Sequence, residues 1–312
     1  MDKISVFYDH IVQAAEQTGR PVQEILREVK EQGITGVEIR LSDLLRDKER
    51  LLESFEQEGL CISSIFENYN WNEQPDLTYA KQHVDTAYEL GVGSILVVPG
   101  YVTEEQGQKM RKLHLKMIER VEYLDGIEEV NQMKRCLQEL VDYAEEKAKE
   151  RPDGRRVYVT VEDYDDVRVP LNTTWQLREF LEDVQGLKFT LDCGNFAFGD
   201  EDAYNACMCL DRYVVHVHCK DRGRELSPKY WFKIFSRGLA TVPVGKGYVK
   251  ISKILERLAR MGYDGYYAIE HFNAKDQLKY IKQSTKFLKS ELKLYREVEE
   301  AARQYEALQN KD

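Results

Sequence analysis

Four side chains that can bind a metal stand at the ends of four apolar segments of the chain. The segments cover residues 157–162, 187–192, 213–218 and 266–270, and they end in Glu162, Asp192, His218 and Glu270. Three carboxylates and one imidazole form a mainly hard ligand set, which suits Mn²⁺ or Mg²⁺ and also Zn²⁺. A single acidic residue at a strand end is more often a helix cap or a salt-bridge partner. Four in consecutive segments favour one shared divalent-metal site.

A metal site of this kind supports proton transfer beside a carbonyl group. Moving a carbonyl between adjacent carbons, or inverting a stereocentre next to one, requires removal of a weakly acidic C–H proton and stabilisation of an enediolate. A bound metal stabilises that charge as a Lewis acid, and a carboxylate on either face of the substrate takes and returns the proton. We therefore predict that Glu162 and Glu270 are acid–base groups as well as ligands.

Several polar residues near these ends are candidates for substrate binding. Side chains alternate along a strand, so Lys220 and His216 share the face of His218. Lys220 is expected either to neutralise a substrate oxyanion or phosphate or to form a salt bridge with Asp221 or Glu162. His216 lies one step deeper, where a hydrogen-bonded role in the core is favoured over ligation.

Earlier strands supply three further candidates. Arg40 ends the second expected strand and Glu67 the third, so both could bind the far end of a polyol or form structural ion pairs. His10, at the end of the first expected strand, is a candidate for substrate contact. The remaining histidines are assigned no chemistry: His83 and His114 follow helical patterns and are expected to face solvent, and His271 is expected to pack.

The elements that must position these residues alternate along the whole chain. Strands are predicted at residues 4–10, 36–40, 61–67, 94–100, 157–162, 187–192, 213–218 and 265–270. Helices are predicted at about 21–32, 44–57, 77–90, 128–149, 174–184, 203–210, 249–261 and 276–309. Eight alternating pairs indicate an α/β protein with a single (β/α)₈ TIM barrel, although a doubly wound open sheet also alternates in this way. In such a barrel the active site lies at the carboxyl ends of the strands.

Three segments depart from this alternation within the single domain expected for residues 1–312. Residues 101–127 are expected to be an insertion after the fourth strand, as a helical segment or a lid. Residues 222–246 are aromatic and basic without a clear period, which favours a loop that carries Trp231 and Phe232 over a pocket. Residues 276–312 form a long C-terminal helical extension. Its extra apolar residues predict packing on a neighbouring helix or on a second subunit: Leu292, Leu294, Tyr295, Val298 and Ala302.

Composition narrows the range of partners. The 45 basic and 55 acidic residues give a net charge of −10, which argues against a nucleic-acid partner, although a local site could still bind a small anion. The N-terminus lacks the apolar core of a signal peptide, and no apolar run is long enough for a membrane span. The six cysteines are scattered, which argues against disulfides or a zinc ribbon. We expect a cytoplasmic protein.

The motifs around the candidate ligands resemble those of the xylose isomerase-like TIM-barrel superfamily, the sugar phosphate isomerases and epimerases. The matching stretches are Val161-Glu162-Asp163, Leu191-Asp192-Cys193-Gly194-Asn195, His216-Val217-His218-Cys219-Lys220-Asp221, Val244-Gly245-Lys246-Gly247 and Ile269-Glu270. The resemblance implies a divalent metal held by Glu162, Asp192, His218 and Glu270. The position of Asn195 is often His in relatives. Asn keeps a hydrogen-bonding group for a substrate but loses proton transfer and most metal affinity.

Four functions follow from this interpretation. The first is a metal-dependent sugar or polyol isomerase or epimerase, and the second is a dehydratase or lyase of an inositol-type ketone, since an enediolate can also expel a β-hydroxyl group. The third, an abasic-site endonuclease of the same superfamily, needs more than six histidines and a basic surface. The fourth is a barrel that has lost catalysis, which the intact ligands argue against and Asn195 keeps open.

Overall fold

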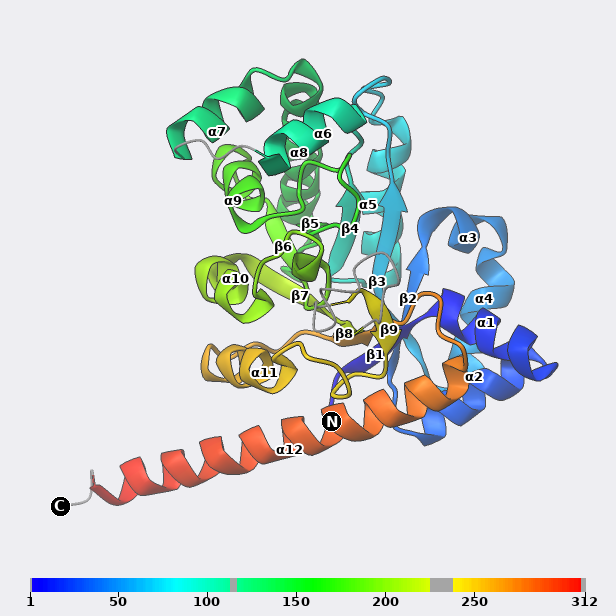
Figure 1. Ribbon diagram of the computed structural model, residues 1–312. Helices are drawn as coiled ribbons and strands as arrows, with labels where there is room; N and C mark the ends of the chain where they lie inside the picture. The colour runs from blue at the N-terminus through cyan, green and yellow to red at the C-terminus, as the bar shows by residue number, and fades with distance from the viewer. Residues whose placement is uncertain (1, 113–116, 225–237, 310–312) are drawn as a thin grey trace.

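Eight parallel strands close into a barrel in the order β1-β10-β7-β6-β5-β4-β3-β2. The structure is a computed structural model, and it describes residues 2–112, 117–224 and 238–309 (Figure 1). The strands are β1 (Ile4–Phe7), β2 (Gly36–Arg40), β3 (Cys61–Asn68), β4 (Ser94–Val98), β5 (Tyr158–Glu162), β6 (Lys188–Asp192), β7 (Val214–Cys219) and β10 (Tyr267–Ile269). The predicted (β/α)₈ TIM barrel is therefore confirmed.

Helices cover the outside of the barrel (Figure 1). They are α1 (Tyr8–Thr18), α2 (Val22–Glu31), α3 (Leu41–Arg46), α4 (Lys48–Gln57), α5 (Thr78–Leu90), α6 (Glu104–Lys112), α7 (Met117–Asp125), α8 (Glu128–Lys149), α9 (Thr174–Asp183), α10 (Ala203–Leu210), α11 (Ile251–Arg260) and α12 (Gln277–Gln309). In α2, for example, Ile25, Leu26 and Val29 follow helical spacing and are all buried. The apolar stripe of such a helix packs against the outer face of the strands.

The strands are buried on both faces, but the two faces differ in chemistry. Val37 and Ile39 point to the helices, whereas Glu38 between them points into the barrel. A polar layer fills the barrel interior below the strand ends. Its buried members are Ser5, Glu38, Ser64, Thr160, Thr190 and His216.

Two segments differ in secondary structure from the sequence-based prediction. The first strand ends at Phe7 instead of His10, and α1 starts at Tyr8. The segment expected as a loop at 222–246 contains two short strands, β8 (Asp221–Gly223) and β9 (Ala240–Val242), which pair antiparallel. Residues 231 and 232, expected over the pocket, lie outside the described residues. Within 101–127 the structure places α6 and α7, in agreement with a helical segment.

The C-terminal helix α12 is present and extends well beyond the barrel (Figure 1). It contacts α1 and α11, and the Tyr295 hydroxyl donates a hydrogen bond to the carbonyl of Ser252 in α11 at 2.7 Å. Leu292 is buried, but Leu294 and Val298 are 51% and 59% exposed. The helix therefore packs on a neighbouring helix, as one prediction stated, and contact with a second subunit stays a prediction.

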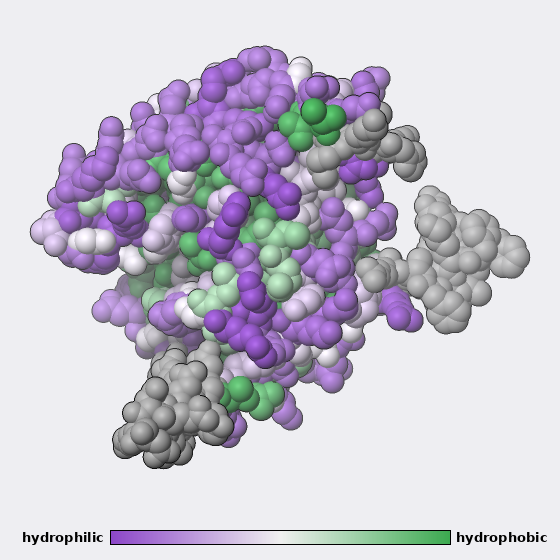
Figure 2. Space-filling view, turned by 90° about the vertical axis from the view of Figure 1, so that its left-hand side faces the viewer, coloured by the Kyte–Doolittle hydropathy of each residue, from purple (hydrophilic) through white to green (hydrophobic). Residues whose placement is uncertain are grey.

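The face in Figure 2 is mainly hydrophilic, with apolar residues in small separate patches. Among the described residues, no helix combines the length and the apolar character that crossing a bilayer requires. All six cysteines are free thiols.

Candidate metal centre and active site

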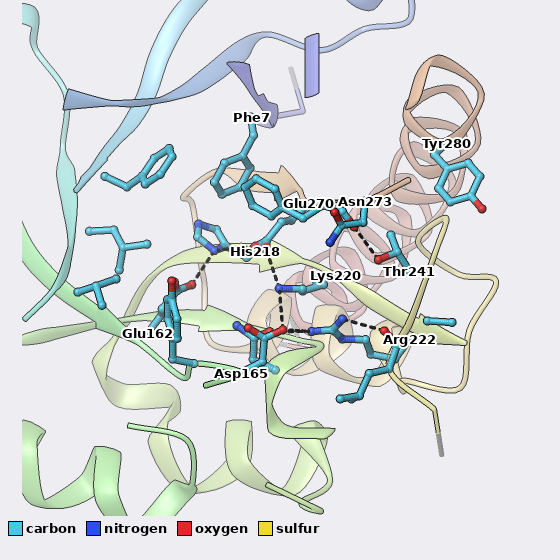
Figure 3. Close-up of a pocket in the computed structure, with 18 of the residues that line it drawn as sticks. Phe7, Glu162, Asp165, His218, Lys220, Arg222, Thr241, Glu270, Asn273 and Tyr280 are labelled. Carbon is cyan, nitrogen blue, oxygen red and sulfur yellow. Dashed lines mark hydrogen bonds and ion pairs between the residues drawn. The ribbon is translucent and has the colours of Figure 1, made fainter. Parts of the chain in front are cut away.

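A cavity of about 1130 Å³ opens at the carboxyl ends of the barrel strands. Phe7, Phe66, Leu96 and Phe272 give it an apolar part, and Arg40 lies over the ring of Phe66 at 4.6 Å. Charged side chains from β5, β7 and the end of β10 line the rest (Figure 3). The cavity therefore offers an apolar surface beside a charged centre.

The four predicted ligands meet at this charged centre. One candidate ligand atom from each of Glu162, Asp192, His218 and Glu270 lies within 4.8 Å of those of the other three, and all four side chains are buried. Nδ1 of His218 is 3.0 Å from Oε2 of Glu162 and 3.2 Å from Oε2 of Glu270. Strand register causes this convergence, since β6 and β7 pair Asp192 directly with His218.

A buried oxygen of Asp192 tests whether these residues fit a cation. Its Oδ1 accepts hydrogen bonds from the backbone N–H groups of Gly194 and Asn195, but Oδ2 is buried and has no hydrogen-bond partner among the described residues. A buried carboxylate oxygen without a hydrogen bond is costly even with the Lys220 ammonium group 3.6 Å away, and a metal ion would satisfy it. The donor set of three carboxylates and one imidazole fits Mn²⁺, Mg²⁺ or Zn²⁺.

Crowding of the acids perturbs their ionisation. Burial raises the pKa of Asp192 well above its usual value, and the charges of Glu270 and Glu162 add to this while Lys220 opposes it. Burial also raises the pKa of Glu162, against the effect of His218. At Glu270 burial is outweighed by Lys220 and His218, which hold the pKa well below its usual value. The two predicted acid–base groups therefore sit in unlike environments.

Lys220 makes an ion pair inside the cavity. Its Nζ is 2.6 Å from Oε1 of Glu270, 3.6 Å from Oδ2 of Asp192 and 3.8 Å from Oδ2 of Asp165. The predicted salt bridge of Lys220 with Asp221 or Glu162 was therefore wrong. Asp221 instead accepts hydrogen bonds from the backbone N–H groups of Gly245 and Gly247 at 2.9 and 2.8 Å. A Cβ on residue 247 would lie 2.1 Å from Asp221, so this Gly-x-Gly turn depends on the close approach.

Asn195 lines the cavity, but both ends of its amide are already bonded. Its Nδ2 donates to the carbonyl of Asp163 at 2.8 Å, and its Oδ1 accepts from Arg222 at 3.0 Å. Arg222 also forms a salt bridge with Asp165 at 2.6 Å (Figure 3). The observed role of Asn195 is to join the end of β5 to β8, and a substrate contact by it stays a prediction.

Asp163 was missed by the sequence analysis. Its Oδ1 accepts from the backbone N–H of Asp192 at 3.1 Å, and its Oδ2 is buried without a partner among the described residues. Burial, together with the charges of Asp192 and Glu162, raises its pKa well above the usual value. The only signal was its position beside Glu162, on the opposite face of the strand.

Arg40 and Glu67 form the structural ion pair that was one of the two expectations. Their side chains are 3.0 Å apart. Glu67 also accepts from the backbone N–H groups of Ser42 and Asn68 at 3.0 and 2.9 Å and from the Tyr79 hydroxyl at 3.2 Å. Only Arg40 of the pair lines the cavity, and substrate binding by either residue stays a prediction.

His10 does not line the cavity. It lies in α1 and is fully buried, and its Nε2 accepts a hydrogen bond from the backbone N–H of His271 at 2.7 Å. Its ring lies behind those of Phe7 and Phe272, at centroid distances of 5.5 and 4.8 Å, and these two phenylalanines line the cavity. The prediction of a strand-end substrate contact was therefore misplaced, because the strand ends three residues earlier.

His216 lies in the barrel interior, and its ring donates a hydrogen bond to a carboxylate that the sequence analysis did not single out. Its Nε2 is 2.8 Å from Oε2 of Glu38, in agreement with the favoured hydrogen-bonded role. Glu38 also contacts Nε2 of His218, at 3.1 Å through Oε1. Alternation along β2 was the available signal, since Glu38 shares the face of Arg40.

The remaining histidines have mixed outcomes. His83 was expected to face solvent, but it is fully buried, and its Nδ1 is 3.0 Å from the Tyr69 hydroxyl. His271 packs as expected, and its Nε2 is 2.8 Å from the hydroxyl oxygen of Ser284 in α12. His114 lies outside the described residues.

The fold and the site together define a barrel of one known class. The family model described as xylose isomerase-like TIM barrel matches residues 26–291, so the chain belongs to this family. The resemblance seen in the motifs is thereby confirmed.

Two curated relatives and one solved structure are similar to the chain. Inosose dehydratase of Geobacillus thermodenitrificans is 25% identical over 259 residues, which is 80% of this chain and 81% of that protein. Rhizopine catabolism protein MocC of Rhizobium meliloti is 36% identical over 91 residues, or 27% of either chain. A solved D-tagatose 3-epimerase-like protein superposes with a TM-score of 0.64 at 20% identity, covering 95% of this chain and 98% of its own, which supports the fold.

Proposed function

We propose that this protein is a divalent-metal-dependent isomerase or epimerase that acts on a sugar, a sugar phosphate or a polyol-derived ketone through an enediolate. The observation that carries the proposal is the convergence of Glu162, Asp192, His218 and Glu270 within 4.8 Å, with Glu162, His218 and Glu270 lining one cavity. These four residues would hold the ion. A bound divalent ion would polarise the substrate carbonyl and stabilise negative charge on the adjacent oxygens.

The protein's own groups then divide the proton transfer. Glu162 lines the cavity, and among the described residues its salt-bridge partner is His218, with no lysine or arginine paired to it. Glu162 is therefore placed to take the C–H proton on one side of the substrate. Glu270 is placed to return a proton on the other side, and Lys220, 2.6 Å from its Oε1, holds that carboxylate in position.

Lys220 also lines the cavity, so its ammonium group can donate to a substrate oxygen as negative charge develops. The apolar part of the cavity suits the C–H face of a sugar or polyol ring, because such rings present C–H groups between their hydroxyls. Arg40, at the rim beside Phe66, is placed to bind the far end of the substrate.

A dehydratase of an inositol-type ketone is the second candidate. It is favoured by the match to inosose dehydratase over 80% of this chain. Both reactions form the same enediolate. In the dehydratase reaction the enediolate then expels the hydroxyl group on the next carbon. Elimination of water and a new ultraviolet absorbance of the product would distinguish it from an isomerase or epimerase.

The test combines metal analysis with proton exchange. The purified protein is analysed for bound metal and then incubated in D₂O, with Mn²⁺, Mg²⁺ or Zn²⁺ added, with a panel of ketoses, aldoses and inososes. We expect at least one substrate to exchange the proton on the carbon next to its carbonyl for deuterium. The loss of that proton's signal is measured by ¹H NMR. Glu162→Gln serves as the matched control and should not exchange. Metal binding without exchange or turnover on any substrate would instead favour a barrel that has lost catalysis.

A further inference from the structure

We infer that Glu38 is a positioning residue that orients His218 so that Nδ1, and not Nε2, faces the metal. The inference rests on the proposed metal centre and concerns a residue in the middle of β2, two residues before the strand end. Glu38 is fully buried, with no exposed surface.

The geometry around the His218 ring has two sides. Nδ1 lies 3.0 Å from Glu162 and 3.2 Å from Glu270, on the side of the acidic cluster. Nε2 lies 3.1 and 3.2 Å from the two oxygens of Glu38, on the side of the barrel interior. A carboxylate can only accept, so Nε2 must carry the proton that it donates to Glu38. Nδ1 likewise faces carboxylates, those of Glu162 and Glu270, and donates to them when no ion is bound. A metal bound on that side would take the place of the Nδ1 proton, while Nε2 would keep its proton on Glu38.

Glu38 is itself held in place. Its Oε2 is 2.8 Å from Nε2 of His216, the ring two residues before His218 on β7. β2 and β7 are not neighbours in the barrel, so the carboxylate spans the interior to reach both rings. Phe7 packs its ring against that of His218 at 5.0 Å with an angle of 72°, which limits rotation of the imidazole. The ring orientation is thus fixed from below and from one side.

Such a carboxylate behind a histidine ligand fixes the tautomer and makes the ligand more basic. Loss of this kind of partner typically weakens metal binding by about 10- to 100-fold. A second possibility is that Glu38, His216 and His218 bind an ion themselves, since their ligand atoms also lie within 4.8 Å of one another. The two ideas differ in stoichiometry, because this second site would add an ion to each chain.

The affinity test uses Mn²⁺ as the probe, with the free ion measured by electron paramagnetic resonance. We expect one Mn²⁺ per chain in the wild-type protein and about 10- to 100-fold weaker binding in Glu38→Gln, which keeps the shape and removes the charge. Thr190→Val is the matched control. Its hydroxyl lies in the same buried layer, and among the described residues its hydrogen-bond partner is Thr160 at 2.7 Å and none of the candidate ligands. The affinity of this variant should therefore stay within about twofold of the wild type.

The tautomer is tested on the unmodified protein, so the inference does not depend on the variant folding. In Zn²⁺-loaded wild-type protein, ¹⁵N NMR should show a proton on Nε2 of His218 and the metal on Nδ1. Metal on Nε2, unchanged affinity in Glu38→Gln, or two Mn²⁺ per chain would each overturn the role of Glu38 and leave the proposed metal centre standing. A wild-type protein that binds none of these ions would overturn both.

Discussion

Lys220 and Glu270 form a buried ion pair, with Nζ 2.6 Å from Oε1, although they come from different strands of the barrel. The same ammonium group is 3.6 Å from Oδ2 of Asp192. Burial opposes a charge on Lys220, but the neighbouring carboxylates raise its pKa above the usual value, so the cation persists at neutral pH. Lys220 thus offsets part of the negative charge that three acids bring to one centre.

Removing this cation should reduce catalysis more than it reduces metal binding. In Lys220→Met the side chain keeps much of its volume, but Glu270 loses its partner and the developing oxyanion loses a donor. We expect kcat to fall by roughly 10²- to 10³-fold on the identified substrate. Steady-state kinetics on metal-loaded protein measures this. A kcat near that of the wild type would show that the pair is only structural.

Glu162 and Asp192 should separate proton transfer from ligation. Glu162→Gln removes the proposed base, so turnover and exchange of the substrate proton in D₂O should fall by about 10²- to 10⁴-fold. Asp192→Asn should instead lose the ion, because it neutralises the carboxylate whose Oδ2 accepts no hydrogen bond among the described residues. Excess Mn²⁺ should restore part of the activity in Asp192→Asn and little in Glu162→Gln. The reverse pattern would exchange the two roles.

Metal removal should lower the thermal stability. An ion that binds only the folded state stabilises it by about 2.7 kcal/mol when its concentration is 100 times Kd. The melting temperature should therefore drop after treatment with a chelator and rise again with added Mn²⁺ in differential scanning calorimetry. Asp192→Asn is the control and should show little rise. Equal melting temperatures with and without the ion in the wild-type protein would contradict a metal centre.

The sequence predicted those parts of the fold in which one residue pattern dominates. The apolar runs that end in Glu162, Asp192 and His218 identified both the strands and the polar centre, since parallel strands bring their carboxyl ends together. Glu38 was missed because it stands inside a strand, where its role depends on two histidines about 180 residues away.

Short or locally polar elements were also missed. The strands β8 and β9 have three residues each, too few for an alternating pattern, and they depend on long-range pairing between Asp221–Gly223 and Ala240–Val242. Helix α1 has buried residues at helical spacing, namely His10, Ile11, Ala14 and Ala15, but two of them are alanines and one is a histidine, so the apolar stripe is weak in the sequence. His83 was misplaced because an imidazole on α5 can face either solvent or the core, and only the Tyr69 contact decides.

Burial of His83 should make the protein less stable in mild acid. Burial lowers its pKa from 6.5 to about 4, so the unfolded chain takes up a proton at pH 5 and the folded chain does not. The stabilising contribution is therefore full above pH 6.5 and is lost as the pH falls from 6.5 toward 4. For a single site this amounts to about 2 kcal/mol at pH 5.

His83→Gln removes the titrating group and keeps a polar partner for the Tyr69 hydroxyl. Urea unfolding at pH 7.5 and pH 5 should show that the wild type loses about 2 kcal/mol more than the variant. Because His10 and His271 titrate in both proteins, their effects cancel in this difference. Parallel losses in the two proteins would mean that His83 is protonated in the folded state near its ordinary pKa.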